Sequence, residues 1–267
     1  MPSTRLDAAV AARGLARSRT HAARLISNGY VRVDGTPVVK LSFPVEDEQV
    51  VTVDGVDRYV SRGANKLIAA LDEFPAVTVR GALALDAGAS TGGFTQVLLE
   101  RGARQVIAAD VGHGQLDPII ARDPRVVSVE GYNLRYATPA TLAGASGVEG
   151  PVDLVVGDLS FISLGLVLAP LRALARPDAD FVMLVKPQFE VGRTGVKEGI
   201  VKNRDLRSDA VANVLWSAWD LGLKTAGLLR SPIAGGAGNL EYLAWFSERE
   251  GAHPTEWLQR VTELTGG

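Results

Sequence analysis

The chain has 267 residues, 46% of them apolar, and a formal net charge of −2. This length and composition allow one large and one small domain with hydrophobic cores, and exclude a largely disordered chain. With no cysteine and three scattered histidines, disulfides, thiolate chemistry and a histidine-rich metal centre are excluded, and no metal is expected. There is neither an apolar run of about 20 residues nor a secretory leader, so the expected location is the cytoplasm.

Charge is distributed unevenly along the chain. Residues 1–40 contain seven basic and two acidic side chains, a surplus of five, which leaves −7 for the remainder. Arg17, His21 and Arg24 recur at helical spacing and predict a basic stripe on one helix. In an arbitrary protein such a stripe is more often a solvated face, but it can also bind RNA phosphates. The candidate RNA-binding residues are Arg5, Arg13, Arg17, Arg19, His21 and Arg24.

The first 60 residues predict a small α+β domain. Two short helices are expected, the first ended by Gly14 and the second begun by the N-cap Ser18. β-branched residues on both sides of Asp34-Gly35 are typical of a hairpin, and the run 50–53 repeats this signal before another Asp-Gly pair.

From residue 64 the pattern changes to helices that alternate with short apolar strands. Continuous apolar runs indicate strands covered on both faces, as in a parallel sheet. Strands are expected at 82–86, 105–110, 126–130, 152–158, 181–186, 225–229 and 242–246, and helices at 64–74, 91–100, 164–174 and 205–221. The predicted fold class is therefore α/β, a doubly wound, Rossmann-like seven-stranded domain that follows the small α+β domain.

Glycine and charged residues follow several of the predicted strands. Asp86 and the glycine-rich run 88–93 follow the first strand, Asp110 the second, Asp158 the fourth and Lys186 the fifth. Parallel strands place their carboxyl ends at one edge of the sheet, where ligands bind. Taken singly, each feature is commonly a tight turn, a helix cap or a solvated residue. Their convergence on one edge favours a binding site.

The glycine-rich run narrows the class of ligand. It matches neither the dinucleotide fingerprint nor the phosphate-binding loop of nucleotide triphosphatases. Asp110 lies 24 residues after Asp86, where an acidic residue can accept hydrogen bonds from ribose hydroxyls. Lys186 and Asp158 are candidates for general-base catalysis. Burial lowers the pKa of a lysine from about 10.4, so that its amine can accept a proton, and a neighbouring carboxylate orients that amine.

Several segments match a known family. The region after residue 60 resembles the FtsJ-type ribose methyltransferases, and the whole chain resembles the TlyA family of hemolysin-named ribosomal RNA 2′-O-methyltransferases. The first 60 residues resemble a ribosomal-protein-type RNA-binding domain, with residues 5–35 as the central matching segment. The matching segments of the larger domain are VSRGANKL (60–67), LDAGASTGGFT (85–95), AADVGHGQL (108–116), DLVVGDLSFISL (153–164), LVKPQFEVG (184–192) and GNLEYLAWF (238–246). The resemblance implies an RNA-binding domain at 1–60, with a short linker at 57–60, and a methyltransferase domain at 61–267.

The resemblance also implies which residues act. Its catalytic set corresponds to Lys66, Asp158, Lys186 and Glu241, with Lys186 as the proton acceptor and the others orienting it and the ribose. The implied cofactor is S-adenosylmethionine, with Asp110 on its ribose. The residues implied to bind this methyl donor are Asp86, Gly88, Ser90, Gly92, Gly93, Asp110 and Asp158. The implied substrates are cytidines of small- and large-subunit ribosomal RNA within ribosomal subunits or assembled ribosomes, with a link to capreomycin sensitivity. No oligomeric state is implied.

The linker departs from the family pattern. Some relatives carry an Arg-x-Trp-x tetrapeptide between the domains, whereas this chain has Asp57-Arg58-Tyr59-Val60. In this chain the resemblance therefore does not imply that the linker couples RNA binding to binding of the methyl donor.

Three alternatives remain at this point. A membrane-active hemolysin would need an apolar span or a strongly basic amphipathic helix, and neither is evident. A ribosome-assembly factor with an inactive methyltransferase domain is disfavoured by the intact Lys66, Asp158, Lys186 and Glu241. A pseudouridine synthase would share the N-terminal domain, but its chemistry does not suit a doubly wound fold.

Overall fold

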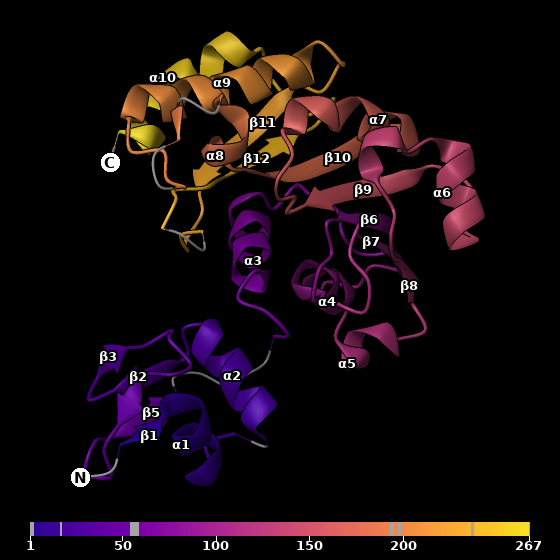
Figure 1. The fold of residues 1–267 in the computed structure, drawn as a ribbon. Helices are drawn as coiled ribbons and strands as arrows, with labels where there is room; N and C mark the ends of the chain where they lie inside the picture. Colours follow the sequence, from indigo (N-terminus) through magenta and orange to yellow (C-terminus); the bar gives the residue numbers. More distant parts are fainter. Residues whose placement is uncertain are drawn as a thin grey trace. The chain divides into compact units, whose positions relative to one another are not determined.

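The computed structural model describes residues 3–16, 18–53, 59–192, 195–196, 199–235 and 238–266. The chain divides into two compact units, Met1–Arg62 and Gly63–Gly267, so that the division falls two residues after the predicted boundary (Figure 1). Asp57 and Arg58 of the linker lie outside the described residues, and Val60 is buried.

The N-terminal unit combines two helices with two small sheets. The helices are α1 (Leu6–Ala12) and α2 (Arg19–Ser27), and the strands are β1 (Thr4–Arg5), β2 (Val31–Val33), β3 (Thr36–Pro37), β4 (Pro44–Val45) and β5 (Val51–Val53). Ser18 is the N-cap of α2, as predicted, and accepts a hydrogen bond from the backbone N–H of His21 at 3.1 Å. The apolar faces of both helices pack with β2 around Leu6, Leu25 and Ile26.

The predicted hairpin is confirmed. Strands β2 and β3 pair antiparallel around Asp34 and Gly35, whose φ angles of 50° and 79° fit a turn with two left-handed residues. Strand β5 joins the other edge of β2, which completes a three-stranded sheet. The pair of β1 with β4 was not predicted, because two strands of two residues each leave no detectable periodicity.

The larger unit is built on a seven-stranded sheet in the order β11-β12-β10-β9-β6-β7-β8 (Figure 1). Every residue of β6 and β12 is buried, which fits the apolar sequence of β12 and, apart from Asp86, that of β6. The strands are β6 (Leu83–Ala87), β7 (Gln105–Ala109), β8 (Val126–Val129), β9 (Val152–Gly157), β10 (Ala175–Val185), β11 (Thr225–Arg230) and β12 (Tyr242–Phe246). Each overlaps one of the seven predicted strands.

Strand direction differs from the prediction at one position. Strand β12 runs antiparallel to both of its neighbours, β10 and β11, so the sheet is mixed rather than uniformly parallel. A strand that is buried on both faces is apolar whichever way it runs, and the sequence therefore carries no sign of its direction.

Helices cover both faces of this sheet. The helices α3 (Ala64–Glu73), α4 (Gly93–Glu100) and α5 (Pro118–Ala121) lie on one side (Figure 1). On the other side lie α6 (Pro139–Ser146), α7 (Leu168–Leu174), α9 (Arg204–Trp219) and α10 (Leu258–Thr265). The helix expected at 164–174 is split into a 3₁₀ turn, η2 (Leu164–Leu166), and α7.

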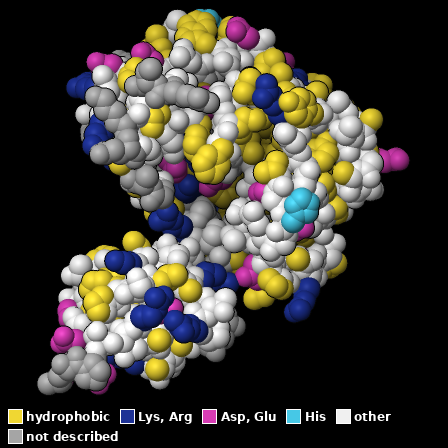
Figure 2. Space-filling model, in the orientation of Figure 1, with side chains coloured by type: hydrophobic (Ala, Val, Ile, Leu, Met, Phe, Trp, Pro, Cys, Tyr) yellow, Lys and Arg dark blue, Asp and Glu magenta, His cyan; other side chains and the backbone are white. Residues whose placement is uncertain are grey.

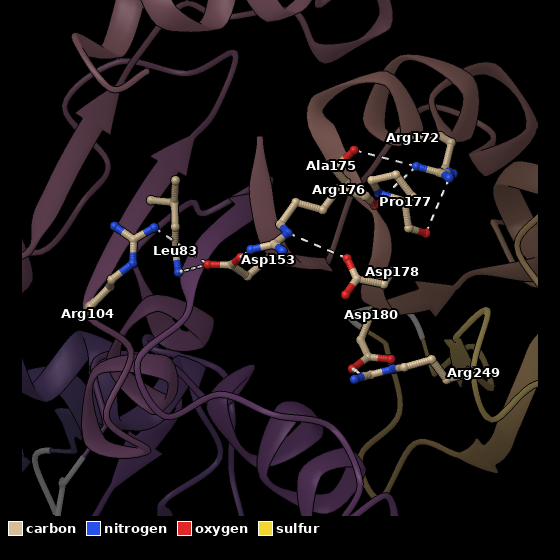
Figure 3. A network of polar contacts seen from close by, with 10 residues as sticks. All are labelled: Leu83, Arg104, Asp153, Arg172, Ala175, Arg176, Pro177, Asp178, Asp180 and Arg249. Carbon is tan, nitrogen blue, oxygen red and sulfur yellow. Dashed lines mark hydrogen bonds and ion pairs between the residues drawn. The ribbon is translucent and has the colours of Figure 1, made fainter. Parts of the chain in front are cut away.

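Asp153 and Asp180, both drawn in Figure 3, lie near the amino ends of the parallel strands and contact neighbouring strands. Asp153 of β9 accepts the backbone N–H of Leu83 at 2.8 Å and pairs with Arg176 of β10 at 3.1 Å. Asp180 of β10 accepts from the indole N–H of Trp245 at 3.1 Å. These contacts join β6, β9, β10 and β12 at the edge opposite the carboxyl ends of the parallel strands.

We predict that Asp153→Ala lowers the free energy of unfolding of the larger unit by about 1–3 kcal/mol, because the buried N–H of Leu83 loses its acceptor. Urea titration followed by tryptophan fluorescence measures this unit, since all four tryptophans lie between residues 216 and 257. The control is Asp178→Ala, whose 56% exposed side chain makes a 3.5 Å pair, and a change within about 0.5 kcal/mol is expected there. Equal effects of the two substitutions would contradict the prediction.

Candidate active site

Four charged side chains from four separate segments of the larger unit meet in one cluster. Lys66 lies on α3, Asp158 follows β9, Lys186 follows β10, and Glu241 precedes β12. The Lys66 ammonium lies 3.1 Å from Asp158 Oδ2 and 2.8 Å from Glu241 Oε2. The Lys186 ammonium lies 2.5 Å from Asp158 Oδ1. The four groups therefore form one chain of ion pairs, in which Asp158 is shared by both lysines.

The cluster is largely withdrawn from solvent. Lys66 and Lys186 are each 7% exposed and Glu241 is 3% exposed. Burial by itself raises the pKa of Asp158, but attraction to Lys186 and Lys66, with their hydrogen bonds, holds that pKa below its ordinary value. Asp158 is therefore ionised, and the pairing offsets the desolvation cost of buried charges.

Lys186 has two further contacts. Its ammonium donates to Ser160 Oγ at 2.7 Å and lies 5.9 Å from the centre of the Phe189 ring. The Nζ atom is thus held between the Asp158 carboxylate, the Ser160 hydroxyl and an aromatic face. These contacts fix the position of the Lys186 nitrogen beside Asp158 and Ser160.

A cleft of about 610 Å³ opens beside the cluster at the carboxyl ends of β6, β7 and β9. This volume falls within the usual range of small-molecule sites. Its lining residues are Gly88, Ser90, Asp110, Val111, Gly112, Gln115, Tyr132, Asn133, Leu134, Arg135, Asp158, Leu159, Ser160, Phe161, Ile162 and Val167. Four residues predicted to bind the methyl donor, Gly88, Ser90, Asp110 and Asp158, are among them.

The loop after β6 explains why glycine is needed here. Gly88 has a φ of 83°, and a Cβ atom at this residue would lie 3.1 Å from the carbonyl oxygen of Asp158. The absence of that atom lets the loop lie directly against the end of β9. Asp110 joins the loop to β7, since its Oδ2 accepts from the N–H of Ser90 at 2.9 Å and its Oδ1 from the N–H of Gly112 at 2.7 Å.

The other residues predicted for the donor lie behind this loop rather than on the cleft lining. Gly92 has a φ of 91° and begins α4 as its N-cap, and Gly93 is the first residue of α4. Asp86 is fully buried, and its Oδ2 accepts from the Thr95 hydroxyl at 2.6 Å. Their assignment to donor binding stays a prediction.

Asp86 has an unusual electrostatic environment. Burial raises the pKa of Asp86 to about 7, against the lowering effect of its hydrogen bonds with Thr95. Within the described part of the chain, Oδ1 of Asp86 has no hydrogen-bond partner. A buried carboxyl group with one unpartnered oxygen, directly under the loop of the cleft, destabilises the fold whenever it is ionised.

Sequence reasoning missed part of the cleft. Ser160 and Phe161 follow Asp158 in a loop without periodicity, and the Phe161 ring is 92% exposed at a φ of 64°. Tyr132 and Arg135 line the cleft after β8, whose end had been assigned no site residue. Their position after the carboxyl end of a strand was the available signal.

Three of the arginines predicted to bind RNA, Arg5, Arg13 and Arg19, have partners within the N-terminal unit. Arg5 and Arg19 each lie 3.0 Å from the Asp7 carboxylate, and these contacts, with that of Arg5 largest, lower the pKa of Asp7 to about 2. Arg13 donates to the carbonyl oxygens of Gln49 at 2.6 Å and Glu46 at 3.0 Å. These arginines therefore also stabilise the fold of their unit.

The same side chains remain accessible to a ligand. Arg5 and Arg19 keep 52% and 60% of their side-chain surface exposed. His21 and Arg24 lie partly buried on α2, and Arg17 is outside the described residues. Figure 2 shows Lys and Arg side chains gathered on the visible face of the N-terminal unit.

Comparison with known proteins gives two domain matches. The model of the FtsJ-like methyltransferase family matches residues 59–248, and that of the S4 domain matches residues 4–51. The fold and the two matches define a methyltransferase with an RNA-binding domain of the S4 type. The chain belongs to the FtsJ-like methyltransferase family.

Three relatives extend over most of the chain. It is 51% identical to the 16S/23S rRNA (cytidine-2′-O)-methyltransferase TlyA of Mycobacterium tuberculosis, over 90% of this chain and 88% of the relative. It is 39% identical to Hemolysin A of Brachyspira hyodysenteriae, over 91% of this chain and 99% of the relative. A solved structure of a hemolysin-named protein from Streptococcus thermophilus is 37% identical, with a TM-score of 0.76, and covers 100% of this chain and 95% of that chain. Among the described residues, no helix has the length and apolar character needed to cross a membrane.

We predict that the free energy of unfolding falls as the pH rises from about 4 to about 7, by up to about 4 kcal/mol, because of Asp86. The folded state binds the proton of this carboxyl group up to about pH 7, whereas the unfolded chain releases it near pH 4. In this interval the folded state therefore holds more protons, and its stability decreases with rising pH.

The variant Asp86→Asn removes this titration and should flatten that part of the stability profile. Urea unfolding at pH 5 and pH 8, followed by tryptophan fluorescence, makes the comparison, with Asp178→Asn as an exposed control. A pH slope in Asp86→Asn equal to that of the wild type would refute the assignment to Asp86.

Proposed function

We propose that the chain transfers the methyl group of S-adenosylmethionine to the 2′-oxygen of cytidine in ribosomal RNA, presented by a ribosomal subunit or an assembled ribosome. The supporting observation is the ion-pair chain of Lys186, Asp158, Lys66 and Glu241 beside a 610 Å³ cleft. The name of the Mycobacterium tuberculosis relative gives cytidine 2′-O-methylation of 16S and 23S rRNA.

The residues around the cleft fit the methyl donor. Its nucleoside would meet Asp110 and its amino-acid part would meet the backbone near Gly88 and Ser90, where no side chain blocks close approach. Asp86, Gly92 and Gly93 would hold this loop in place, and Asp158 would lie beside the reacting group. When bound, the sulfonium supplies an electrophilic methyl group.

Lys186 is the residue that accepts the proton of the ribose hydroxyl. Asp158 and Ser160 hold its nitrogen beside the cleft, while Lys66 and Glu241 hold Asp158. With both lysines protonated and both acids ionised, the four groups carry no net charge. To act as the acceptor, Lys186 must first release its proton to solvent. Uptake of the hydroxyl proton by the resulting neutral amine then restores the electrical balance of the buried cluster, which favours the transfer.

The remaining features fit an RNA substrate. Arg5, Arg13, Arg17, Arg19, His21 and Arg24 would bind phosphates and position the RNA without reading its sequence. The exposed ring of Phe161 on the cleft offers an aromatic face of the kind on which unpaired RNA bases stack.

The test is transfer of a radiolabelled methyl group from S-adenosylmethionine to purified small and large ribosomal subunits, with nuclease mapping of the label. Label on a cytidine ribose is expected. Label on a base would contradict the assigned reaction. Absence of label together with absence of donor binding would favour an RNA-binding assembly factor instead.

We predict that Lys186→Ala abolishes methyl transfer but leaves the dissociation constant of S-adenosylmethionine within about threefold, because the amine acts on the hydroxyl and not on the donor. Isothermal titration calorimetry measures binding, and incorporated label measures transfer. The matched control is Lys224→Ala, which removes a lysine that donates to the carbonyl oxygen of Glu248 rather than to the cluster. Near-normal transfer by Lys186→Ala would rule out Lys186 as the proton acceptor.

A further inference from the structure

The loop that carries Asp158, Ser160 and Phe161 is joined to the segment that carries Lys186. The loop spans residues 158–164, and the facing segment is Lys186 with the short helix α8 (Pro187–Glu190). Lys186 contacts Asp158 and Ser160 at one end of this junction. In the middle, the rings of Phe161 and Phe189 lie 5.3 Å apart at an angle of 47°.

Glu190 closes the other end of the junction. Its Oε2 accepts from the Ser163 hydroxyl at 2.5 Å, and its Oε1 accepts from the backbone N–H of Leu164 at 2.9 Å. Ser163 is the N-cap of η2, and its hydroxyl oxygen accepts in turn from the N–H of Gly165 at 3.2 Å. One carboxylate thus holds the point at which the loop enters η2.

The spacing of these contacts sets the register of the two segments. Lys186 is the N-cap of α8 in an extended conformation, and Phe189 and Glu190 are the last two residues of this short helix. In chain order, these three residues contact Ser160, Phe161 and Ser163 of the loop. A shift of Glu190 would therefore displace the Lys186 end of the same short turn.

The loop itself needs such a restraint. A φ of 64° at Phe161 is unfavourable for a bulky residue and persists where the surroundings hold it. Its ring is 92% exposed, so burial of the ring does not supply the restraint. The hydrogen bonds of Glu190 lie two and three residues further along the chain.

We propose that Glu190 is a positioning residue for methyl transfer, whose carboxylate fixes the 158–164 loop so that Ser160 holds Lys186 and Phe161 stays at the cleft. Glu190 is absent from the described lining of the cleft and acts through Ser163 and Leu164. Burial raises the pKa of Glu190, against the hydrogen bonds from Leu164 and Ser163, in agreement with a carboxylate withdrawn from solvent. The proposal rests on the proposed function for its catalytic consequence.

The test compares Glu190→Ala with Glu190→Gln in the full-length chain. The alanine variant removes both acceptors and should lower kcat by about 10- to 100-fold, with the KM for S-adenosylmethionine within about twofold, because catalysis depends on sub-ångström placement of Lys186. The glutamine variant keeps an acceptor for Leu164 and a partner for Ser163, and should restore kcat to within about threefold of wild type. Glu263→Ala, at an exposed position on α10, is the matched control.

Hydrogen exchange at the Leu164 amide supplies a readout that does not require methyl transfer. Exchange should be at least tenfold faster in Glu190→Ala than in the wild type or in Glu190→Gln. Ser163→Ala removes the other partner of the Glu190–Ser163 hydrogen bond and should also lower kcat. It remains a test of the proposal if Glu190→Ala fails to fold. The double variant of Glu190→Ala with Ser163→Ala should be no slower than Glu190→Ala, since both changes break one connection.

The outcomes separate the two proposals. Unchanged hydrogen exchange at the Leu164 amide in Glu190→Ala would overturn the claim that Glu190 fixes the 158–164 loop, whether or not the chain methylates RNA. Faster exchange with unchanged kcat, or equal loss of kcat in the glutamine and alanine variants, would overturn the positioning role. Absence of methyl transfer by the wild-type chain would overturn the proposed function. Hydrogen exchange at Leu164 would then still show whether Glu190 fixes the 158–164 loop.

Discussion

The Asp158 carboxylate, shared between two buried ammonium groups, is the interaction on which the site depends. It links Lys186 to Lys66, and through Lys66 to Glu241. Its own position is set by β9 and by Gly88, whose missing side chain lets the neighbouring loop lie against the end of that strand. A central strand of the sheet, a glycine turn and a charged cluster are therefore parts of one arrangement.

The charged residues at the amino ends of the parallel strands differ in their contacts from those at the carboxyl ends. At the amino edge, Asp153 and Asp180 accept hydrogen bonds from neighbouring strands and hold them together. At the carboxyl edge, the charged cluster lies beside an open cleft, and behind the cleft loop lies Asp86, whose Oδ1 has no hydrogen-bond partner among the described residues. Buried carboxyl groups of this second kind cost stability.

The N-terminal unit also contains a carboxylate that is paired with two basic side chains. Asp7 is held between Arg5 and Arg19, just as Asp158 is held between Lys186 and Lys66. The difference lies in exposure, since both arginines keep more than half of their side-chain surface in solvent. They can therefore support their own fold and keep exposed surface for a ligand, whereas the two lysines of the larger unit are each only 7% exposed.

The sequence by itself determined the seven strands, the doubly wound class, the Asp34-Gly35 hairpin and the Ser18 cap, because each depends on local periodicity or turn chemistry. It also placed Asp158 and Lys186 at one edge, because the carboxyl ends of parallel strands coincide. Glu241 escaped this reasoning because β12 runs antiparallel, so that its amino end lies where its neighbours have their carboxyl ends. Lys66 and Glu190 escaped it because they lie on helices, and no local pattern shows what a helical side chain will meet. Strand direction and contacts between distant segments were decided by the tertiary structure, since they depend on packing that apolar periodicity does not encode.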